Sequence, residues 1–97
     1  MPAFEVTGEE IGAGLSVIVV DSDPGAGPEL HRHEYPEVFV VLEGQATFTL
    51  GDEERVVQAG EVAVAPPGVP HRFVNSGDGR LLQVDIHENA RFVTEWL

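Results

Sequence analysis

The chain has 97 residues and a formal charge of −12, from 17 acidic residues against five arginines and no lysine. An acidic surface repels nucleic acid and anionic membranes, so we expect neither as a partner. The absence of cysteine excludes thiol nucleophiles, disulfides and thiolate metal ligands, and the absence of lysine excludes Schiff-base chemistry. Any catalysis therefore depends on His, Asp, Glu, Arg, Tyr35 or a cofactor.

Length and hydropathy predict a single domain over residues 1–97, because a chain this short supports one hydrophobic core. The longest uninterrupted apolar run, 38–42, is too short to span a bilayer. No basic-then-apolar segment opens the chain, so we expect a cytoplasmic protein.

Short segments rich in Val, Ile, Phe and Thr alternate with clusters of turn residues, which is the pattern of β-strands. Regularly spaced short strands predict an all-β fold, an antiparallel small barrel or jelly roll. The tail, 88–97, fits a short amphipathic helix or a strand, and we expect it to pack on the barrel or on a partner. The strands are expected at 15–20, 38–42, 45–50, 62–65 and 81–86.

The Glu43-Gly44 turn is interpreted as a two-residue hairpin loop that pairs Leu42 with Gln45. The outer face of the first strand then carries Val38, Val40 and Leu42, which is more apolar than a solvated face should be. This face predicts a homodimer. Side-chain alternation places a second set in the interior: Glu37, Phe39, Val41, Ala46, Phe48 and Leu50.

The segment 76–79, SGDG, is interpreted as a four-residue hairpin loop. The pairing that follows places His71 and Phe73 on the interior face. It assigns Asp85 and His87 to the exterior, the latter as a surface histidine.

Two of the four histidines, His31 and His33, have the i, i+2 spacing that puts strand side chains on one face. Such a pair alone is more often a surface feature than a ligand pair. Glu37 follows the bend at Tyr35-Pro36, and His71 begins its own inward-facing strand. Three imidazoles and one carboxylate suit one divalent first-row transition metal, Mn, Fe, Ni, Co, Cu or Zn, rather than Ca or Mg.

Two stretches of the chain, GAGPELHRHEYPEVFVVLEG at 25–44 and GEVAVAPPGVPHRFVN at 60–75, resemble the two conserved motifs of the cupin superfamily. They occur in the family's order, with 15 residues between Gly44 and Gly60. The resemblance implies a small jelly-roll barrel, often assembled as a dimer. It also implies the metal ligands: His31, His33, Glu37 and His71.

Four protein ligands on an octahedral ion leave two positions for water, substrate or dioxygen, so the predicted site is open. Arg32 and Arg72 alternate away from it, which favours a neutral or weakly acidic small molecule over a carboxylate held by arginine. We expect a metalloenzyme with a dioxygenase as first candidate and an isomerase or decarboxylase next. The alternative is a non-catalytic cupin that binds or senses a small ligand. The aromatic candidates for a pocket are Tyr35, Phe39, Phe48 and Phe73.

Overall fold

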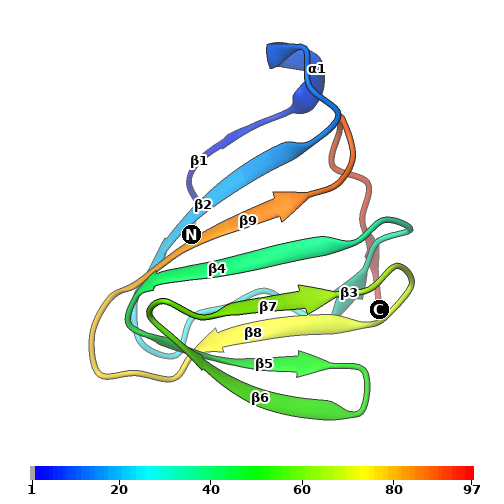
Figure 1. Ribbon diagram of the computed structural model, residues 1–97. Coiled ribbons are helices and arrows are strands. Elements are labelled where there is room, and N and C mark those ends of the chain that lie inside the picture. Colours follow the sequence, from blue (N-terminus) through cyan, green and yellow to red (C-terminus); the bar gives the residue numbers. More distant parts are fainter. Residues whose placement is uncertain (1) are drawn as a thin grey trace.

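The computed structural model describes residues 2–97 as two five-stranded antiparallel sheets that face each other (Figure 1). The predicted all-β jelly roll is therefore confirmed. In spatial order, sheet 1 contains β1 (Pro2–Val6), β2 (Ser16–Ser22), β9 (Leu81–His87), β4 (Glu37–Glu43) and β7 (Val62–Ala65). Sheet 2 contains β10 (Glu95–Trp96), β3 (His31–Arg32), β8 (His71–Asn75), β5 (Gln45–Leu50) and β6 (Glu53–Gln58).

All five strands expected from the sequence are present, with ends that differ from the prediction by at most two residues. The longer strands β1 and β6 were not predicted. β6 is an edge strand with a single buried side chain, Val57, so its sequence lacks a regular apolar alternation. The helical turn α1 (Gly8–Ile11) was also missed; it begins with a capping box in which Thr7 Oγ1 accepts a hydrogen bond from the Glu10 N–H.

The apolar core lies between the sheets, where Phe39 of β4 and Phe48 of β5 meet with ring centroids 4.8 Å apart. The interior assignment of β4 and β5 is confirmed for all but Leu50, which is half-buried. We refer below to the apolar core as the following set: Val20, Phe39, Val41, Ala46, Phe48, Val57, Ala63, Ala65, Phe73 and Leu81.

The predicted hairpin between β4 and β5 is wrong, although the prediction of which side chains of these strands face the interior is confirmed. β4 pairs with β7 and β9, and β5 pairs with β6 and β8, so the two strands belong to different sheets. The turn at Gly44 carries the chain across the interior. Gly44 has φ 87°, and a Cβ at this position would collide with the backbone of Arg80.

The predicted hairpin between β8 and β9 is also wrong, because β8 pairs with β5 while β9 lies between β2 and β4. Asn75 shapes the crossing loop: its Nδ2 donates to the carbonyls of Ser22 and Gly79, and its Oδ1 accepts from the Gly77 N–H. The alternation of β9 is therefore shifted by one residue from the prediction. Its buried side chains are Leu81, Gln83, Asp85 and His87.

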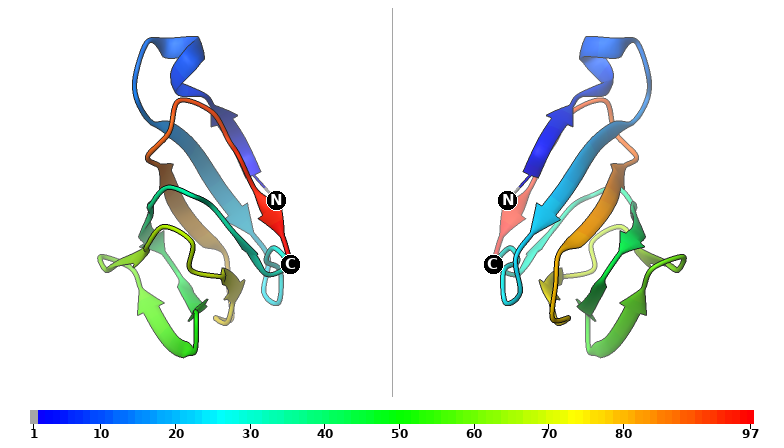
Figure 2. Two further views of the ribbon diagram at one scale, coloured as in Figure 1. Left: turned by 90° about the vertical axis from the view of Figure 1, so that its right-hand side faces the viewer. Right: turned by 90° about the vertical axis from the view of Figure 1, so that its left-hand side faces the viewer.

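The C-terminal tail contains a short strand, β10, rather than a helix, and it packs on the barrel. Glu95 pairs with Arg32 and Trp96 with His31 in β3, and Arg32 Nη2 lies 2.7 Å from Glu95 Oε2. Seen from the side, this strand lies across the interior from β4 and β7 (Figure 2). Within residues 2–97, no helix is long and apolar enough to cross a membrane.

Candidate metal centre

Four buried residues converge at one end of the interior, and we call them the metal cluster: His31, His33, Glu37 and His71. Each offers a ligand atom, and these atoms all lie within 4.8 Å of one another. Glu37 begins β4 in sheet 1, while His31 and His71 face each other across β3 and β8 in sheet 2. The four residues can therefore hold one metal ion between the two sheets.

Backbone contacts position the loops that carry the cluster. The Gly68 N–H donates to the His33 carbonyl at 2.7 Å, which ties the turn before β8 to the segment between β3 and β4. Gly68 has φ 77°, a left-handed conformation that glycine adopts without steric cost. The two sequence motifs are thus joined at the site by a main-chain hydrogen bond.

The ring orientation of all three histidines is held by main-chain carbonyl oxygens. A carbonyl only accepts, so each Nδ1 carries the hydrogen and each Nε2 faces the cluster, the tautomer of a metal-binding imidazole. The Nδ1 contacts are His31 to Glu29 (2.8 Å), His33 to Val93 (2.8 Å) and His71 to Val69 (3.0 Å).

The donor set fits a divalent transition metal. Glu37 Oε1 lies 3.0 Å from His33 Nε2 and 3.1 Å from His71 Nε2. The His33 contact lacks the geometry of a hydrogen bond, so His33 Nε2 is a buried nitrogen without a hydrogen-bond partner. His71 has acceptors at both ring nitrogens, which only an imidazolium or a metal-bound imidazole satisfies. A metal ion between these atoms would resolve both problems.

A fourth histidine, His87, reaches the same site, which corrects its assignment as a surface residue. It is 4% exposed, and its Nε2 lies 3.1 Å from Glu37 Oε2. Its Nδ1 lies 2.8 Å from the Tyr35 hydroxyl, which accepts a hydrogen bond from the Val93 N–H. The Tyr35 O–H therefore donates to His87 Nδ1, which leaves the hydrogen of a neutral ring on Nε2, the atom next to Glu37 Oε2. One oxygen of Glu37 is held by His87, and the other faces the metal cluster.

Electrostatics keep Glu37 ionised. Burial alone would raise the pKa of Glu37, but contacts with three histidine rings outweigh burial and lower it well below its usual range. Burial lowers the pKa of His31. Burial also acts against the charged form of His33, but the Glu37 carboxylate and the Val93 carbonyl raise its pKa overall. The cluster thus combines a retained negative charge with imidazole nitrogens, which favours a bound cation.

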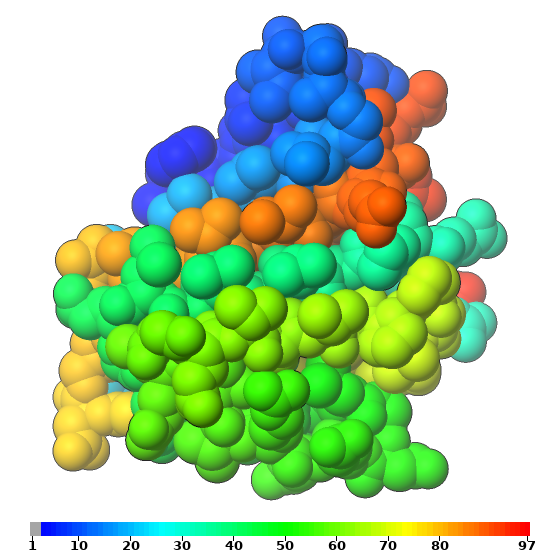
Figure 3. All heavy atoms as spheres, viewed as in Figure 1, coloured from blue at the N-terminus to red at the C-terminus, as the bar shows by residue number. Residues whose placement is uncertain are grey.

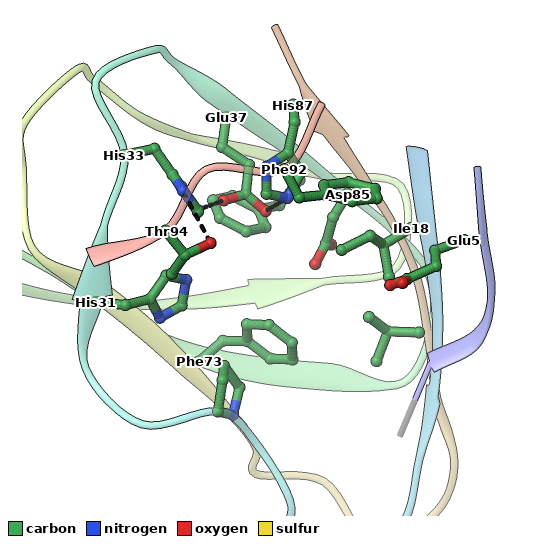
Figure 4. A pocket seen from close by; sticks show the side chains of 13 residues that line it. Glu5, Ile18, His31, His33, Glu37, Phe73, Asp85, His87, Phe92 and Thr94 are labelled. Carbon is green, nitrogen blue, oxygen red and sulfur yellow. Dashed lines mark hydrogen bonds and ion pairs between the residues drawn. The ribbon is translucent and has the colours of Figure 1, made fainter. Parts of the chain in front are cut away.

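A cavity of about 260 Å³ opens beside the metal cluster (Figure 4). Of the predicted pocket aromatics, Phe39 and Phe73 line it, while Phe48 is fully buried in the apolar core and Tyr35 is hydrogen-bonded to His87. Within residues 2–97, no arginine lines the cavity. Its apolar walls are formed by Ile18, Val20, Pro28, Phe39, Phe73 and Phe92, and its polar groups by Glu5, His31, His33, Glu37, Asp85, His87 and Thr94.

A two-sheet jelly roll with a buried His/Glu cluster beside an internal cavity is the architecture of a small β-barrel with an internal site. The family model described as "Cupin domain" matches residues 18–87, which is most of the chain. The protein therefore belongs to the cupin family.

Curated relatives include both isomerase and dioxygenase enzymes. H2HPP isomerase of Bacillus subtilis is 36% identical over 64 residues, covering 65% of this chain and 27% of the enzyme. The 3-hydroxyanthranilate 3,4-dioxygenase of Xanthomonas euvesicatoria pv. vesicatoria is 39% identical over 59 residues, covering 57% of this chain and 34% of that enzyme. Acireductone dioxygenase of Schizosaccharomyces pombe is 31% identical over 71 residues, covering 67% of this chain and 40% of that enzyme. The chain spans well under half the length of each.

Solved structures share the fold over almost the entire chain. A cupin-like protein from Thermotoga maritima superimposes with a TM-score of 0.85 at 25% identity, covering 97% of this chain and 73% of that one. Oxalate decarboxylase from Lactobacillus farciminis superimposes with a TM-score of 0.87 at 24% identity, covering 97% of this chain and 30% of that one. At this level of identity the decarboxylase supports the fold alone.

Proposed function

We propose that this cupin is a metalloenzyme that holds one divalent first-row transition metal and acts on a small organic molecule, with dioxygenase-type oxidation as the first candidate. The proposed ligands are His31, His33, Glu37 and His71. The observation that carries the proposal is the convergence of three Nε2 atoms and Glu37 Oε1 in a buried cluster, with His33 Nε2 lacking a hydrogen-bond partner. Isomerisation and decarboxylation are the next candidate reactions.

Each part of the site has a distinct role in this proposal. A bound divalent ion would supply Lewis acidity and open positions for a ligand oxygen. The main-chain carbonyls orient the three imidazoles, and His87 holds the second oxygen of Glu37. The apolar walls, including Phe39 and Phe73, would exclude water and contact the body of the bound molecule.

The named relatives support this choice of reaction, because two of the three reported above are dioxygenases and the third is an isomerase. The chemistry of the cavity supports a small molecule that is neutral or weakly acidic, since no arginine lines it among the described residues. The charge of −12 argues against nucleic acid and anionic membranes as partners.

We also propose a homodimer formed through the outer face of β4 and β7. Val38 and Val40 are half-buried there, while Leu42, Val62 and Val64 are 53%, 46% and 47% exposed. Figure 3 views the molecule from this side and shows the β4 and β7 segments at the surface. Adjacent apolar side chains on one sheet face are typical of a subunit interface.

The dimer is tested by Val64→Glu, with Val56→Glu as control. Val56 is 53% exposed on β6 in the other sheet, so its substitution changes charge equally without touching the proposed interface. Sedimentation should give a dimer for the wild type and Val56→Glu and a monomer for Val64→Glu. A monomeric wild type would overturn the proposal.

The metal is tested by elemental analysis of protein purified from its native host, since heterologous expression can load the wrong ion. We expect about one first-row metal per chain, as a single site of this kind holds one ion. His71→Ala should lose the metal. His87→Ala is the matched control, a buried histidine of the same site outside the ligand set, and it should retain metal with weaker affinity. Full occupancy in His71→Ala would overturn the ligand assignment.

Catalysis is tested by metal-dependent oxygen consumption with candidate phenols and diketones. Consumption by the wild type and none by His71→Ala would support the dioxygenase. Ligand-induced stabilisation without turnover would instead favour the non-catalytic, small-ligand-binding cupin. Turnover without oxygen uptake would direct the assignment to isomerisation or decarboxylation.

A further inference from the structure

Asp85 is a buried carboxyl group inside the cavity that the proposed metal site does not use. It lies on β9 and is 3% exposed. Figure 4 shows its side chain pointing into the cavity between the histidine cluster and Ile18. Its Oδ1 accepts a hydrogen bond of 2.7 Å from Gln83 Nε2. Among residues 2–97, its Oδ2 has no hydrogen-bond partner.

The fold gives no reason for a carboxyl group at this position. Burying a carboxyl without a full set of partners costs free energy, and an apolar residue or an asparagine would avoid the charge. No lysine or arginine lines the cavity within the described part of the chain, so no permanently charged side chain pairs with the group. Gln83 is itself fully buried, and its Oε1 lacks a partner. A ligand in the cavity would supply a hydrogen-bond partner for the free oxygen of Asp85, which lines the cavity.

We propose that Asp85 is a second polar anchor of this cavity, which binds a hydroxyl or amino group of a small molecule whose other end is held at the metal cluster. The inference rests on the proposed metal site and names the chemical class of its ligand. That ligand has metal-binding oxygen at one end, an apolar body, and a hydrogen-bond donor at the other end.

The cavity sets the size of the apolar body. A cavity of roughly 150 Å³ accommodates a benzene molecule, so one of about 260 Å³ has room for a substituted single ring. Phe39, Phe73 and Ile18 would contact its faces and edges.

The same geometry disfavours molecules that carry a carboxylate at both ends. A second carboxylate would face Asp85 and the exposed Glu5, which also lines the cavity, with no arginine to neutralise the charge. The proposed ligand therefore differs from oxalate, although several structures that share this fold are oxalate decarboxylases or oxidases.

The experiment uses zinc-loaded protein and calorimetric titration with benzohydroxamate probes, which chelate metal through two oxygens. The ring carries a methyl, hydroxymethyl, aminomethyl or carboxyl group at position 3 or 4. In the wild type, the better hydroxymethyl or aminomethyl isomer should bind about tenfold tighter than its methyl counterpart. The carboxyl probes should bind most weakly.

Variants assign the preference to Asp85. Asp85→Leu should bind the methyl probe about as well as the wild type but lose the preference for donor groups. Asp85→Asn keeps an acceptor without the charge, so it should retain part of the hydroxymethyl preference and lose the aminomethyl preference. Asp52→Asn, on the exposed turn between β5 and β6, is the matched control and should behave as the wild type.

The outcomes separate this inference from the metal site. If the methyl probe binds but donor groups give no advantage, or if the advantage persists in Asp85→Leu, the role of Asp85 is overturned while the metal site stands. If the protein fails to hold zinc, both proposals fall. If Asp85→Leu does not fold, the wild-type probe series and Asp85→Asn decide the question.

Discussion

The two ends of the interior are equally buried but chemically opposite. At one end Phe48 is 0% exposed within the apolar core, and at the other His71 is 2% exposed within the metal cluster. β4 runs through both, with Glu37 and Phe39 two residues apart on the same face. The apolar end contributes hydrophobic free energy, whereas the polar end costs desolvation and leaves His33 Nε2 without a hydrogen bond.

This contrast assigns separate roles to the two ends. Stability should come mainly from the apolar core, and ligand binding from the metal cluster, which gains its full set of contacts only with a cation present. Substitutions at the two ends should therefore be distinguishable by whether their effect depends on metal.

The largest expected effect is on stability, from Phe48→Ala in the apolar core. Phe48 packs on Phe39 and Phe73, with ring centroids 4.8 and 5.5 Å apart. Its truncation should lower the free energy of unfolding by about 3–5 kcal/mol, with or without metal. Urea denaturation with and without chelator measures this. Val56→Ala, at an exposed position, should change stability by less than about 0.5 kcal/mol. A loss confined to the metal-loaded protein would contradict the separation of roles.

Metal removal should give the next largest effect. Binding to the folded state alone stabilises it by about 2.7 kcal/mol when free metal is about 100 times its dissociation constant. Thermal unfolding before and after chelation should show this loss in the wild type and in Phe48→Ala if that variant still folds. His71→Ala should show no response to chelation. An equal response in His71→Ala would place the metal elsewhere.

The two motifs and strand alternation together predicted that His31, His33, Glu37 and His71 converge, and the structure brings these four side chains together. The i, i+2 spacing of His31 and His33 and the inward parity of Glu37 and His71 depend only on strand alternation, which survives errors in strand pairing. Both hairpin predictions were wrong, since the turns at Gly44 and after Asn75 cross between sheets. For β4 and β5, the same side chains face the interior whether the turn forms a hairpin or crosses between the sheets. The error in pairing therefore did not affect the predicted inward residues of these two strands.

For β9 the same error exchanged the inner and outer faces of the strand. The predicted site therefore did not include Asp85 and His87. Its alternation is also misleading: Gln83, Asp85 and His87 point inward, while Leu82, Val84 and Ile86 are half-buried on the other face. Hydrophobic periodicity would choose the wrong face here. The polar side chains of β9 face inward because the cavity lies there, and its apolar side chains face outward. Neither the cavity nor the position of β9 between β2 and β4 can be derived from the periodicity of this segment.

A smaller effect, on metal affinity more than on the metal-free fold, is expected from Tyr35→Phe. The change removes the O–H that donates to His87 Nδ1, so His87 loses the contact that orients its ring and keeps its hydrogen on Nε2, next to Glu37. Metal affinity should fall about tenfold, the lower range for residues that orient ligands, while the metal-free protein loses about 1 kcal/mol. Competition with a chromophoric chelator measures the affinity. Thr47→Val, which removes a hydroxyl that is hydrogen-bonded to Ser76, should leave the metal affinity unchanged. Unaltered affinity in Tyr35→Phe would exclude its positioning role.

The smallest effect should be a gain in stability, from Asp85→Asn in metal-free protein. Burial and then the charge of Glu37 raise the pKa of Asp85 above its ordinary value near 3.8. The native state therefore holds this proton more tightly than the unfolded state, and the stability it provides is present below about pH 3.8 and lost as pH rises through the native pKa. The stabilisation from this proton is therefore smaller at pH 7 than at acidic pH, whereas an asparagine has no proton to lose, so we expect Asp85→Asn to be the more stable protein at pH 7.

Urea denaturation of both proteins at pH 7 and at pH 4.5 tests this sign. At pH 7, Asp85→Asn should be more stable by more than the roughly 0.5 kcal/mol typical of surface changes, and the gain should shrink at pH 4.5. A loss of stability at pH 7 would show that the carboxyl is needed by the fold through its bond to Gln83. A gain combined with weaker donor-probe binding would show instead that Asp85 is retained for its ligand at the expense of stability, which extends the contrast between the two ends to a single side chain.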